Sequence, residues 1–326
     1  MARAAPNALS LVADVGGTNT RVALADGTSV RAATVRRFSN ADHPSLESVL
    51  ETFVAAEGGI DCGGAAVAVA GPVRDGVGHL TNLDWSLDKA TLAAVTGAEV
   101  VAVLNDMQAA GHALGFVAPE KVQTVIEGPE AGPHAAKLVV NIGTGFNAAP
   151  VFEAEQGRLV TPSECGHAGL PVRTEADLRL AAYVADAHGF PAVEDVLSGR
   201  GLERIYAWLG DEAGAPSALG AAGIMSALAA GTDPRAEDAA AIFVRHMGAV
   251  AGDLALTHLP FGGLHLVGGV ARAFGPHLAR LGFAEAFADK GRFAAFMAEF
   301  PVRLVLDDYA PLTGLASHLA RLKMDI

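Results

Sequence analysis

The sequence predicts an α/β protein of two domains. Its 326 residues exceed what one hydrophobic core usually organises. A glycine–threonine turn opens each half of the chain, so we expect a duplicated fold. Short apolar runs that end in turn or polar residues are typical of buried strands in an α/β sheet, and they occupy residues 9–13, 65–70, 100–104, 138–140, 264–267 and 304–306.

Composition excludes several classes of protein. Hydrophobic residues make up 51% of the chain and charged residues 18%, which allows a large buried core. The formal net charge of −13 argues against nonspecific binding to nucleic acid or to an anionic membrane, because both require a cationic surface. The two cysteines, Cys62 and Cys165, are too few for a disulfide framework or an all-cysteine metal site.

Targeting signals are not expected. Residues 1–7 lead into a strand pattern without the apolar core of a signal peptide. The most hydrophobic regions are interrupted by Asp, Gly or Pro before they reach the length of a membrane span. We therefore expect a soluble, cytoplasmic protein with no nucleic-acid or membrane partner.

Helix signals lie between the strands. Asp233 followed by proline is typical of an N-cap and first helical position, and apolar residues at 243, 247, 250 and 254 would form one face of a long helix. Thr174 with Asp177 indicates a capping box. The segment 210–231, rich in Gly, Ala and Ser, is predicted to be a loop with a short helix.

The first glycine turn suits a phosphate group. An apolar strand reaches Asp14, and a turn with Gly16, Gly17, Thr18 and Asn19 follows. Such a turn exposes backbone N–H groups and a hydroxyl with little side-chain bulk, and the carboxylate could orient a hydrated Mg²⁺. An ordinary hairpin turn would use the same residues, but the repeat of the turn favours the phosphate interpretation.

The second glycine turn also fits a dinucleotide-binding pattern. Residues 143–148 read Gly-Thr-Gly-Phe-Asn-Ala, and Glu164 falls near the offset expected for the acidic partner. A Rossmann helix cannot follow, however, because Pro150 and the Val-Phe pair at 151–152 come next. The segment is therefore predicted to be the second strand of a hairpin.

Polar residues that follow other strands are candidates for chemistry. Asp106 suits a helix N-cap, which the local sequence favours, but it could also be a general base with Asn105 binding substrate beside it. The paired glycines Gly268 and Gly269 permit either a tight turn or the close approach of a nucleobase. No P-loop, nucleophile elbow or H-E-x-x-H motif occurs.

The loop Ser-Glu-Cys-Gly-His places Glu164 three residues before His167. The pair could bind a metal, but no third ligand stands at a suggestive spacing, so hydrogen bonding to vicinal hydroxyls is favoured over metal binding. A solvated loop is the plain alternative. Cys165 is expected to be a small packing residue. Glu194 could join this clamp, although its spacing alone fits a surface charge.

Eight motifs follow one another along the chain in a fixed order. They are Asp-Val-Gly-Gly-Thr-Asn, Leu-Thr-Asn-Leu-Asp-Trp at 80–85, Leu-Asn-Asp, Gly-Thr-Gly, Glu-Cys-Gly-His, Val-Leu-Ser-Gly-Arg-Gly-Leu, Val-Gly-Gly-Val and Asp-Lys-Gly-Arg-Phe at 289–293. This ordered series resembles that of bacterial glucokinases, from about residue 10 to residue 320. The resemblance implies a two-domain actin-like ATPase (ribonuclease H-like) fold with an active-site cleft between the domains. It implies a small α/β domain of residues 1–116 plus 306–326 and a large α/β domain of residues 117–305.

The same resemblance implies a glycolytic reaction, in which ATP with Mg²⁺ phosphorylates the 6-hydroxyl of glucose, and a homodimer. Asp106 would be the catalytic base, and Asp14 would hold the magnesium through water. The sugar-binding residues would be Asn105, Asp106, Glu164, His167 and Glu194. The nucleotide site would be lined by Asp14, Gly16, Gly17, Thr18, Asn19, Gly143, Thr144, Gly145, Gly268 and Gly269.

Some positions depart from the family pattern. Asn147 stands where the family usually has glycine; asparagine would be the best substitute if the backbone there is left-handed, but its side chain could alter the nucleotide pocket. Ser163 and Cys165 flank Glu164 where glycine is frequent, and Pro311-Leu-Thr-Gly replaces a Leu-Leu-Gly step. The alternatives are a kinase for mannose, fructose or glucosamine, or a non-catalytic sugar sensor, which would need a DNA-binding module.

Overall fold

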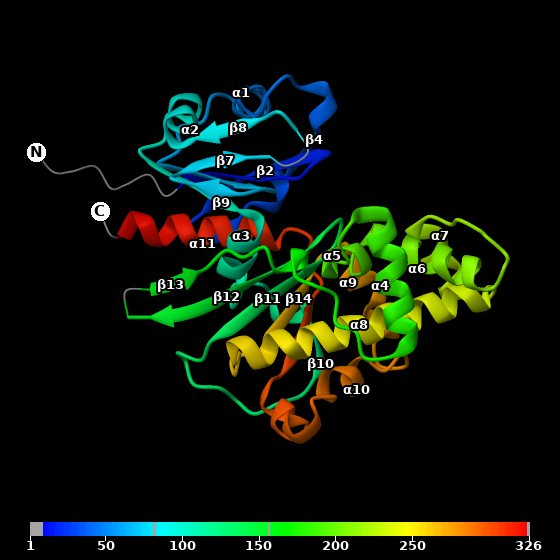
Figure 1. Ribbon diagram of the computed structural model, residues 1–326. Coiled ribbons are helices and arrows are strands. Elements are labelled where there is room, and N and C mark those ends of the chain that lie inside the picture. The colour runs from blue at the N-terminus through cyan, green and yellow to red at the C-terminus, as the bar shows by residue number, and fades with distance from the viewer. Residues whose placement is uncertain (1–8, 81–82, 156, 325–326) are drawn as a thin grey trace, which may run out of the picture. The chain divides into compact units, whose positions relative to one another are not determined.

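The computed structural model describes residues 9–80, 83–155 and 157–324 (Figure 1). By its contacts the chain divides into two compact units. The first unit comprises Met1–Pro119 with Asp307–Ile326, and the second unit comprises Glu120–Leu306. Residues 1–7, where no signal peptide is expected, and residues 81–82 of the Leu-Thr-Asn-Leu-Asp-Trp motif lie outside the described residues.

The first unit is built on a six-stranded sheet with the path β3-β2-β1-β5-β9, on which β4 pairs with β2. The first two strands form an antiparallel hairpin, whereas β5 and β9 run parallel to β1. A small sheet of β6 (Val73–Arg74), β7 (Val77–His79) and β8 (Ser86–Asp88) lies in the same unit. The main strands are β1 (Leu9–Val15), β2 (Asn19–Asp26), β3 (Ser29–Val30), β4 (Arg36–Ser39), β5 (Gly64–Val69) and β9 (Val100–Asn105).

The second unit repeats this topology in the order β10-β15-β14-β11-β12-β13. A hairpin of β11 and β12 continues into antiparallel β13, and β14 and β15 lie parallel on the other side of β11. The duplication expected from the two glycine turns is therefore confirmed. The strands are β10 (Val122–Ile126), β11 (Lys137–Ile142), β12 (Phe146–Ala154), β13 (Gly157–Val160), β14 (Leu264–Val267) and β15 (Val302–Val305).

Helices cover both faces of the first sheet. Successive residues of a strand point to opposite faces, so Leu11 packs with helices α1 (Leu46–Ala56) and α2 (Lys89–Thr96), while Val12 packs with α3 (Asp106–Ala113) and α11 (Ala310–Met324). Because both faces are buried, the parallel strands are apolar runs without alternation.

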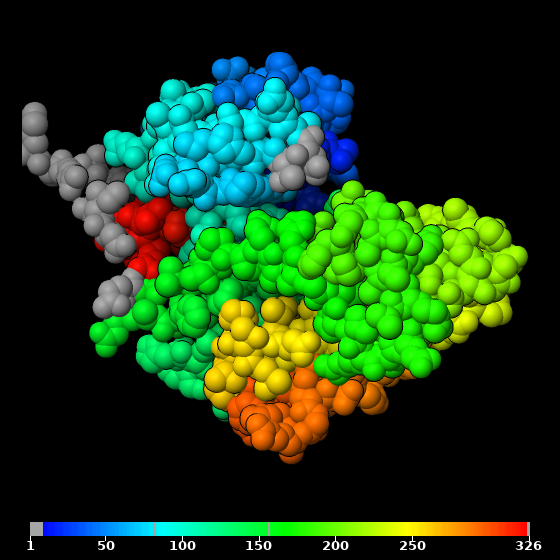
Figure 2. Space-filling model, viewed as in Figure 1, coloured from blue at the N-terminus to red at the C-terminus, as the bar shows by residue number. Residues whose placement is uncertain are grey.

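Helix α8 (Pro234–His258) is the centre of the second unit. Its predicted apolar face is confirmed, since Phe243, Met247 and Val250 are buried in the core. Figure 2 shows α8, in yellow, only in part, because green helices and the orange segment around α10 flank it. The other helices of this unit are α4 (Glu175–His188), α5 (Val193–Val196), α6 (Gly199–Glu212), α7 (Ala221–Ala230), α9 (Gly269–Phe274) and α10 (Phe283–Ala288).

Local start signals for these helices are confirmed. The side chain of Asp233 accepts a hydrogen bond from the Arg235 N–H and so caps α8, and Thr174 forms a capping box with Asp177 at α4. The predicted short helix in 210–231 is α7. The 3₁₀ turns are η1 (Ala32–Thr34), η2 (Asn40–Asp42), η3 (Pro119–Lys121), η4 (Cys165–His167), η5 (Gly275–His277), η6 (Gly291–Phe293) and η7 (Phe296–Glu299).

The expectation that no apolar segment reaches the length of a membrane span is wrong for α8. This helix has 25 residues, and by length and composition alone it is long and apolar enough to cross a membrane. Its most apolar window is 67% buried inside the protein, however. The hydrophobicity of α8 is therefore explained by its place in the core of the second unit.

Gly314 allows α11 to lie directly against α3. A Cβ atom at this position would stand 1.8 Å from the carbonyl oxygen of Ala109 and 2.8 Å from the N–H nitrogen of Ala113. Both are backbone atoms, which cannot rotate away. Pro311 is accommodated in the first turn of α11, where a helix has unpaired N–H groups. The Pro-Leu-Thr-Gly segment thus has a packing explanation.

Replacing Gly314 by alanine is expected to destabilise the first unit by about 1–3 kcal/mol, because overpacking outweighs the better helix propensity of alanine. Urea unfolding followed by circular dichroism measures this change. Gly132→Ala is a matched control, since nothing lies within 4 Å of the Cβ position there. Equal unfolding midpoints for both variants would contradict the packing role.

Candidate active site

The first glycine turn connects β1 to β2. The Gly16 N–H donates to the Asn19 carbonyl across the turn at 3.0 Å, which leaves Gly17 and Thr18 exposed. The segment is therefore the hairpin turn that one interpretation expected, and it also exposes the groups that a phosphate would need.

A residue far along the chain holds this turn. The Asn40 Nδ2 atom donates to the Gly16 carbonyl at 2.8 Å, and the Asn40 N–H donates to the Thr18 carbonyl at 2.9 Å. The Thr20 hydroxyl donates to Asn40 Oδ1 at 2.8 Å. Asn40 is buried, so the turn is rigidly braced. No local sequence signal indicates this role, because the contact joins residues more than twenty positions apart.

Asp14 lies near the end of β1, beside Arg21. Its Oδ2 atom is 3.7 Å from Arg21 Nη1. Burial raises the pKa of Asp14, and the charge of Arg21 opposes that rise. Within the described ranges no cluster of three or more His, Cys, Asp or Glu side chains could hold a metal ion. A single carboxylate nevertheless fits Mg²⁺ that keeps its water and is held mainly by nucleotide phosphates.

Asn105, not Asp106, is the N-cap of α3. Its Oδ1 atom accepts from the Gln108 N–H at 2.7 Å, and Gln108 Oε1 accepts from the Asn105 N–H at 3.1 Å. The expectation that Asp106 caps the helix is therefore wrong. Asp106 is the first residue of α3, and its Oδ1 atom accepts from the Met107 N–H at 2.8 Å.

Asp14 and Asn105 lie at the same edge of the first sheet. In the parallel register, Asp14 is level with Ala68 on β5, and the next residue, Val69, is level with Asn105 on β9. Two strand spacings of about 4.8 Å separate β1 from β9. The first unit therefore presents the phosphate-type turn and the Asn105–Asp106 pair at one sheet edge.

The second glycine turn closes the β11–β12 hairpin, as predicted. The Gly143 N–H donates to the Gly145 carbonyl at 2.9 Å, and the Gly143 carbonyl accepts from the Gly199 N–H at 3.0 Å. Gly268 has a φ of 101°, and a Cβ atom there would lie 2.3 Å from the Ile142 carbonyl oxygen. The two glycine segments of this unit are thus in close contact.

The sequence reasoning missed Asn141, which lies between these glycine segments. Its Oδ1 atom is 2.4 Å from the Cβ position of Gly268 and 3.6 Å from that of Gly143. An amide next to the end of a mostly apolar strand was the available signal.

Glu194 is not a surface charge. It lies on the short helix α5, and its Oε2 atom accepts from the Phe146 N–H at 2.9 Å. A Cβ atom on Gly145 would stand 2.4 Å from the same oxygen. The carboxylate is therefore fixed against the second glycine turn.

The loop with Glu164 and His167 packs against the same strand start. It forms turn η4, closed by the His167 N–H that donates to the Glu164 carbonyl at 3.1 Å, and both side chains are exposed. Gly166 is buried and lies close against β12 and α5. A Cβ atom at this position would lie 2.0 Å from the Phe146 carbonyl oxygen and 3.5 Å from Glu194 Cβ. The structure therefore brings Glu164, His167 and Glu194 together around the start of β12.

Asn147 does not occupy a left-handed position. Among the described non-glycine residues, positive φ angles occur at Asp75 and Leu259, whereas Asn147 pairs with Asn141 inside the hairpin. Its side chain contacts Ser163 and Glu164. Burial raises the pKa of the Cys165 thiol, as suits a packing residue. The departures at 147, 163 and 165 are therefore one connected set.

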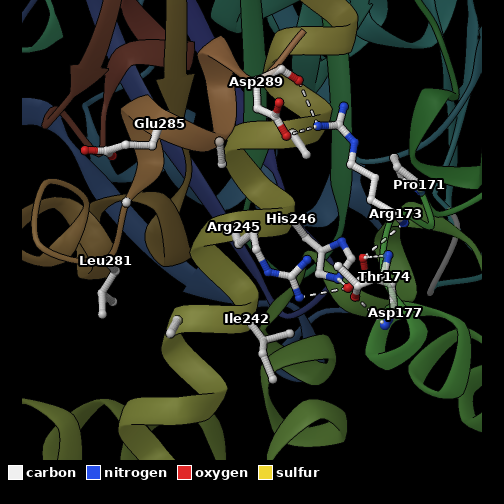
Figure 3. Close-up of a pocket in the computed structure, with 14 residues that line it drawn as sticks. Pro171, Arg173, Thr174, Asp177, Ile242, Arg245, His246, Leu281, Glu285 and Asp289 are labelled. Carbon is white, nitrogen blue, oxygen red and sulfur yellow. Dashed lines mark hydrogen bonds and ion pairs between the residues drawn. The ribbon is translucent and has the colours of Figure 1, made fainter. Parts of the chain in front are cut away.

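A separate cavity of about 560 Å³ lies in the second unit between α4, α8 and α10 (Figure 3). Two pairs of its charged lining side chains point toward each other: Arg245 Nη2 lies 2.8 Å from Asp177 Oδ1, and Arg173 Nη1 lies 3.2 Å from Asp289 Oδ2. None of the site residues expected from the sequence lines it. The cavity is therefore distinct from the candidate active site.

Buried charges beside this cavity predict acid sensitivity. Burial, helped by the charge of Arg245, lowers the pKa of His246 to about 4, although Asp177 opposes the shift. Burial alone would raise the pKa of Asp177, but hydrogen bonds from Arg245 and from the Arg173 N–H bring it to about 2. The folded state thus binds fewer protons than the unfolded state on acidification.

The second unit should therefore lose stability in two steps. As pH falls from about 6.5 to about 4, His246 takes up a proton only in the unfolded chain. This lowers the free energy of unfolding by about 3 kcal/mol. From about 4 to 2 the paired Asp177 contributes a further loss. Calorimetric Tm values between pH 7 and pH 4 measure the first step, and His246→Gln should flatten it. An unchanged slope in that variant would refute the assignment.

Comparison with known proteins agrees with this geometry. A family model described as glucokinase matches residues 11–322. Glucokinase of Sinorhizobium fredii is 32% identical over 309 residues, which cover 94% of this chain and 91% of the relative. Glucokinase of Mesorhizobium japonicum is 32% identical over 310 residues, covering 94% and 90%.

Solved structures give the same result. Glucokinase from an Antarctic psychrotroph superposes with a TM-score of 0.84 at 30% identity, covering 96% of this chain and 98% of that one. Glucokinase from Balamuthia mandrillaris in complex with glucose has a TM-score of 0.81 at 22% identity, covering 96% and 93%. The expected actin-like ATPase fold is confirmed. The chain belongs to the glucokinase family.

Proposed function

We propose that this chain is an ATP-dependent glucokinase, which transfers the γ-phosphoryl group of Mg-ATP to the 6-hydroxyl of glucose. The observation that carries the proposal is the turn at 143–147. Its backbone and side chains contact Glu194, Glu164 and the Gly199 N–H, and it adjoins Gly268. One segment thus links candidate sugar ligands to candidate nucleotide contacts, as phosphoryl transfer requires.

The carboxylates of the second unit suit a neutral polyol. Glu164 and Glu194 can accept hydrogen bonds from sugar hydroxyls, and His167 can donate or accept. An uncharged substrate also tolerates the formal net charge of −13. Asn105 would offer its Nδ2 group as a further donor, because its Oδ1 atom is already used in the helix cap.

Asp106 would act as general base. The O6–H proton passes to its carboxylate, O6 forms a bond to the γ-phosphorus, and the bond from that phosphorus to the bridging oxygen breaks to release ADP. Mg²⁺ held through water by Asp14, when bound with the nucleotide, supplies charge neutralisation on the phosphates. The nucleotide would also contact Gly16, Gly17, Thr18 and Asn19, and Gly143, Thr144, Gly145, Gly268 and Gly269.

A coupled assay of ADP release with Mg-ATP tests this proposal against glucose, mannose, fructose and glucosamine. Glucose should give the highest kcat/KM. A higher value for another hexose would keep the mechanism and change the substrate. Sugar binding without turnover would support the sensor alternative instead.

We also propose a cytoplasmic homodimer that functions in glycolysis, as is usual for the family. Analytical ultracentrifugation of the purified chain measures the oligomeric state. A single species at the monomer mass of 33.2 kDa would contradict the dimer.

A further inference from the structure

Asn147 is placed to hold the sugar-binding loop. It is the second residue of β12, and its Nδ2 atom donates to the Ser163 carbonyl at 2.6 Å. The same nitrogen lies 3.5 Å from Glu164 Oε2. The amide therefore reaches both the backbone just before Glu164 and the carboxylate itself.

The other end of the amide is also engaged. Asn147 Oδ1 accepts from the Ala148 N–H at 2.8 Å and lies 3.1 Å from the Ser163 hydroxyl and 3.6 Å from Cys165 Sγ. The Ser163 hydroxyl donates to the Ala148 carbonyl at the shorter distance of 2.6 Å. These bonds fix the orientation of the amide, so that Nδ2 faces the loop.

Glycine could form none of these side-chain contacts. A glycine at 147 would remove the amide, and glycines at 163 and 165 would remove the hydroxyl and the thiol. The three side chains replace backbone freedom with a hydrogen-bonded connection between strand and loop. We define Asn147, Ser163 and Cys165 as the loop brace.

We propose that Asn147 is a positioning residue, which orients the Glu164 carboxylate toward the sugar through the loop brace. This inference rests on the proposed glucokinase function. Asn147 itself need not touch the sugar, because its donor group is directed at Ser163 and Glu164. A carboxylate held in its binding orientation loses less freedom when substrate binds.

The brace should therefore control the KM for glucose more than kcat. Asn147→Gly is expected to raise this KM about tenfold, the effect of losing one hydrogen bond to a charged group, with kcat within about twofold of the parent value. Gln123→Gly is a control of the same kind, since it also replaces a strand amide by glycine, at an exposed position on β10. Equal KM values for the two variants would overturn the proposal.

A pH profile separates positioning from general packing. Asn147→Asp places a second carboxyl group beside Glu164, and two neighbouring carboxylates raise the pKa of one of them. The KM of this variant should be highest near pH 8 and should fall severalfold toward pH 5.5, where a shared proton restores a donor. A KM without this pH dependence would count against the brace.

A double-mutant cycle with Glu164→Gln completes the kinetic test. If Asn147 acts through Glu164, Asn147→Gly should add less than about twofold to KM in the Glu164→Gln background. Full additivity would show that the two residues act independently and would overturn the proposal.

Hydrogen exchange of the unliganded protein distinguishes failure of this inference from failure of the proposed function. Amides at 163–167 should exchange at least about tenfold faster in Asn147→Gly than in the parent protein, whether or not glucose is the substrate. Unchanged exchange refutes the brace. Faster exchange in a protein that does not phosphorylate glucose would retain the brace and reject the glucokinase proposal.

Discussion

Replacing Asp106 by asparagine is expected to lower kcat with glucose by about 10²–10⁴-fold. Asparagine has nearly the same shape but cannot take the proton of the attacking hydroxyl. Asp106 is the first residue of α3, and the cap hydrogen bonds belong to Asn105, so the substitution leaves the capping box intact. Helix α3 should therefore still begin at residue 106 in this variant.

Glucose affinity separates catalysis from folding in this variant. Isothermal titration should give a dissociation constant within about tenfold of the parent value, because one hydrogen bond to the sugar changes. Asp75→Asn is a control, since that carboxylate is almost fully exposed beside Arg74. Turnover of Asp106→Asn close to that of Asp75→Asn would eliminate Asp106 as the base.

Replacing Gly166 by alanine is expected to lower kcat/KM for glucose by about 10²-fold. A Cβ atom there would lie 2.0 Å from the Phe146 carbonyl oxygen, so the loop must move away from β12. Both Glu164 and His167 would move with it. Steady-state kinetics measure the loss, and circular dichroism verifies that the fold is retained.

Gly169→Ala is the matched control for this loop variant. The nearest atom to its Cβ position is Phe190 Cζ at 3.6 Å, an ordinary van der Waals contact. Activity should stay within about twofold of the parent protein. If the two alanine variants had the same kcat/KM, close packing of the loop on β12 would not control sugar binding.

Buried parallel strands were predictable because both of their faces are apolar. β5 is a continuous apolar run and β14 is apolar except for His265, and for these two strands the predicted ranges differ from the observed ones by at most a residue at each end. β4, Arg-Arg-Phe-Ser, is a partly exposed strand that pairs with β2, so its sequence has no comparable apolar signal. Edge strands depend on pairing partners that a local sequence does not reveal.

Site motifs were predictable where one short segment contains the chemistry. The glycine turns and the Glu164–His167 loop are of this kind. The cap of α3 was misassigned although Asn105 and Gln108 have capping-box spacing. Asn40 could not be assigned a role, because its contacts join segments that only the folded sheet brings together. Asn141 had a local signal, an amide in an apolar strand, but its closeness to Gly268 arises only in the fold.

The position of the phosphoryl group on the product tests the central claim most directly. The purified chain would be incubated with Mg-ATP and glucose, and the product analysed by phosphorus and carbon NMR. Glucose 6-phosphate, with phosphorus–carbon coupling at C6 and one ADP per sugar, is the predicted result. Phosphate on another hydroxyl, or inorganic phosphate with unchanged glucose, would contradict transfer to the 6-hydroxyl.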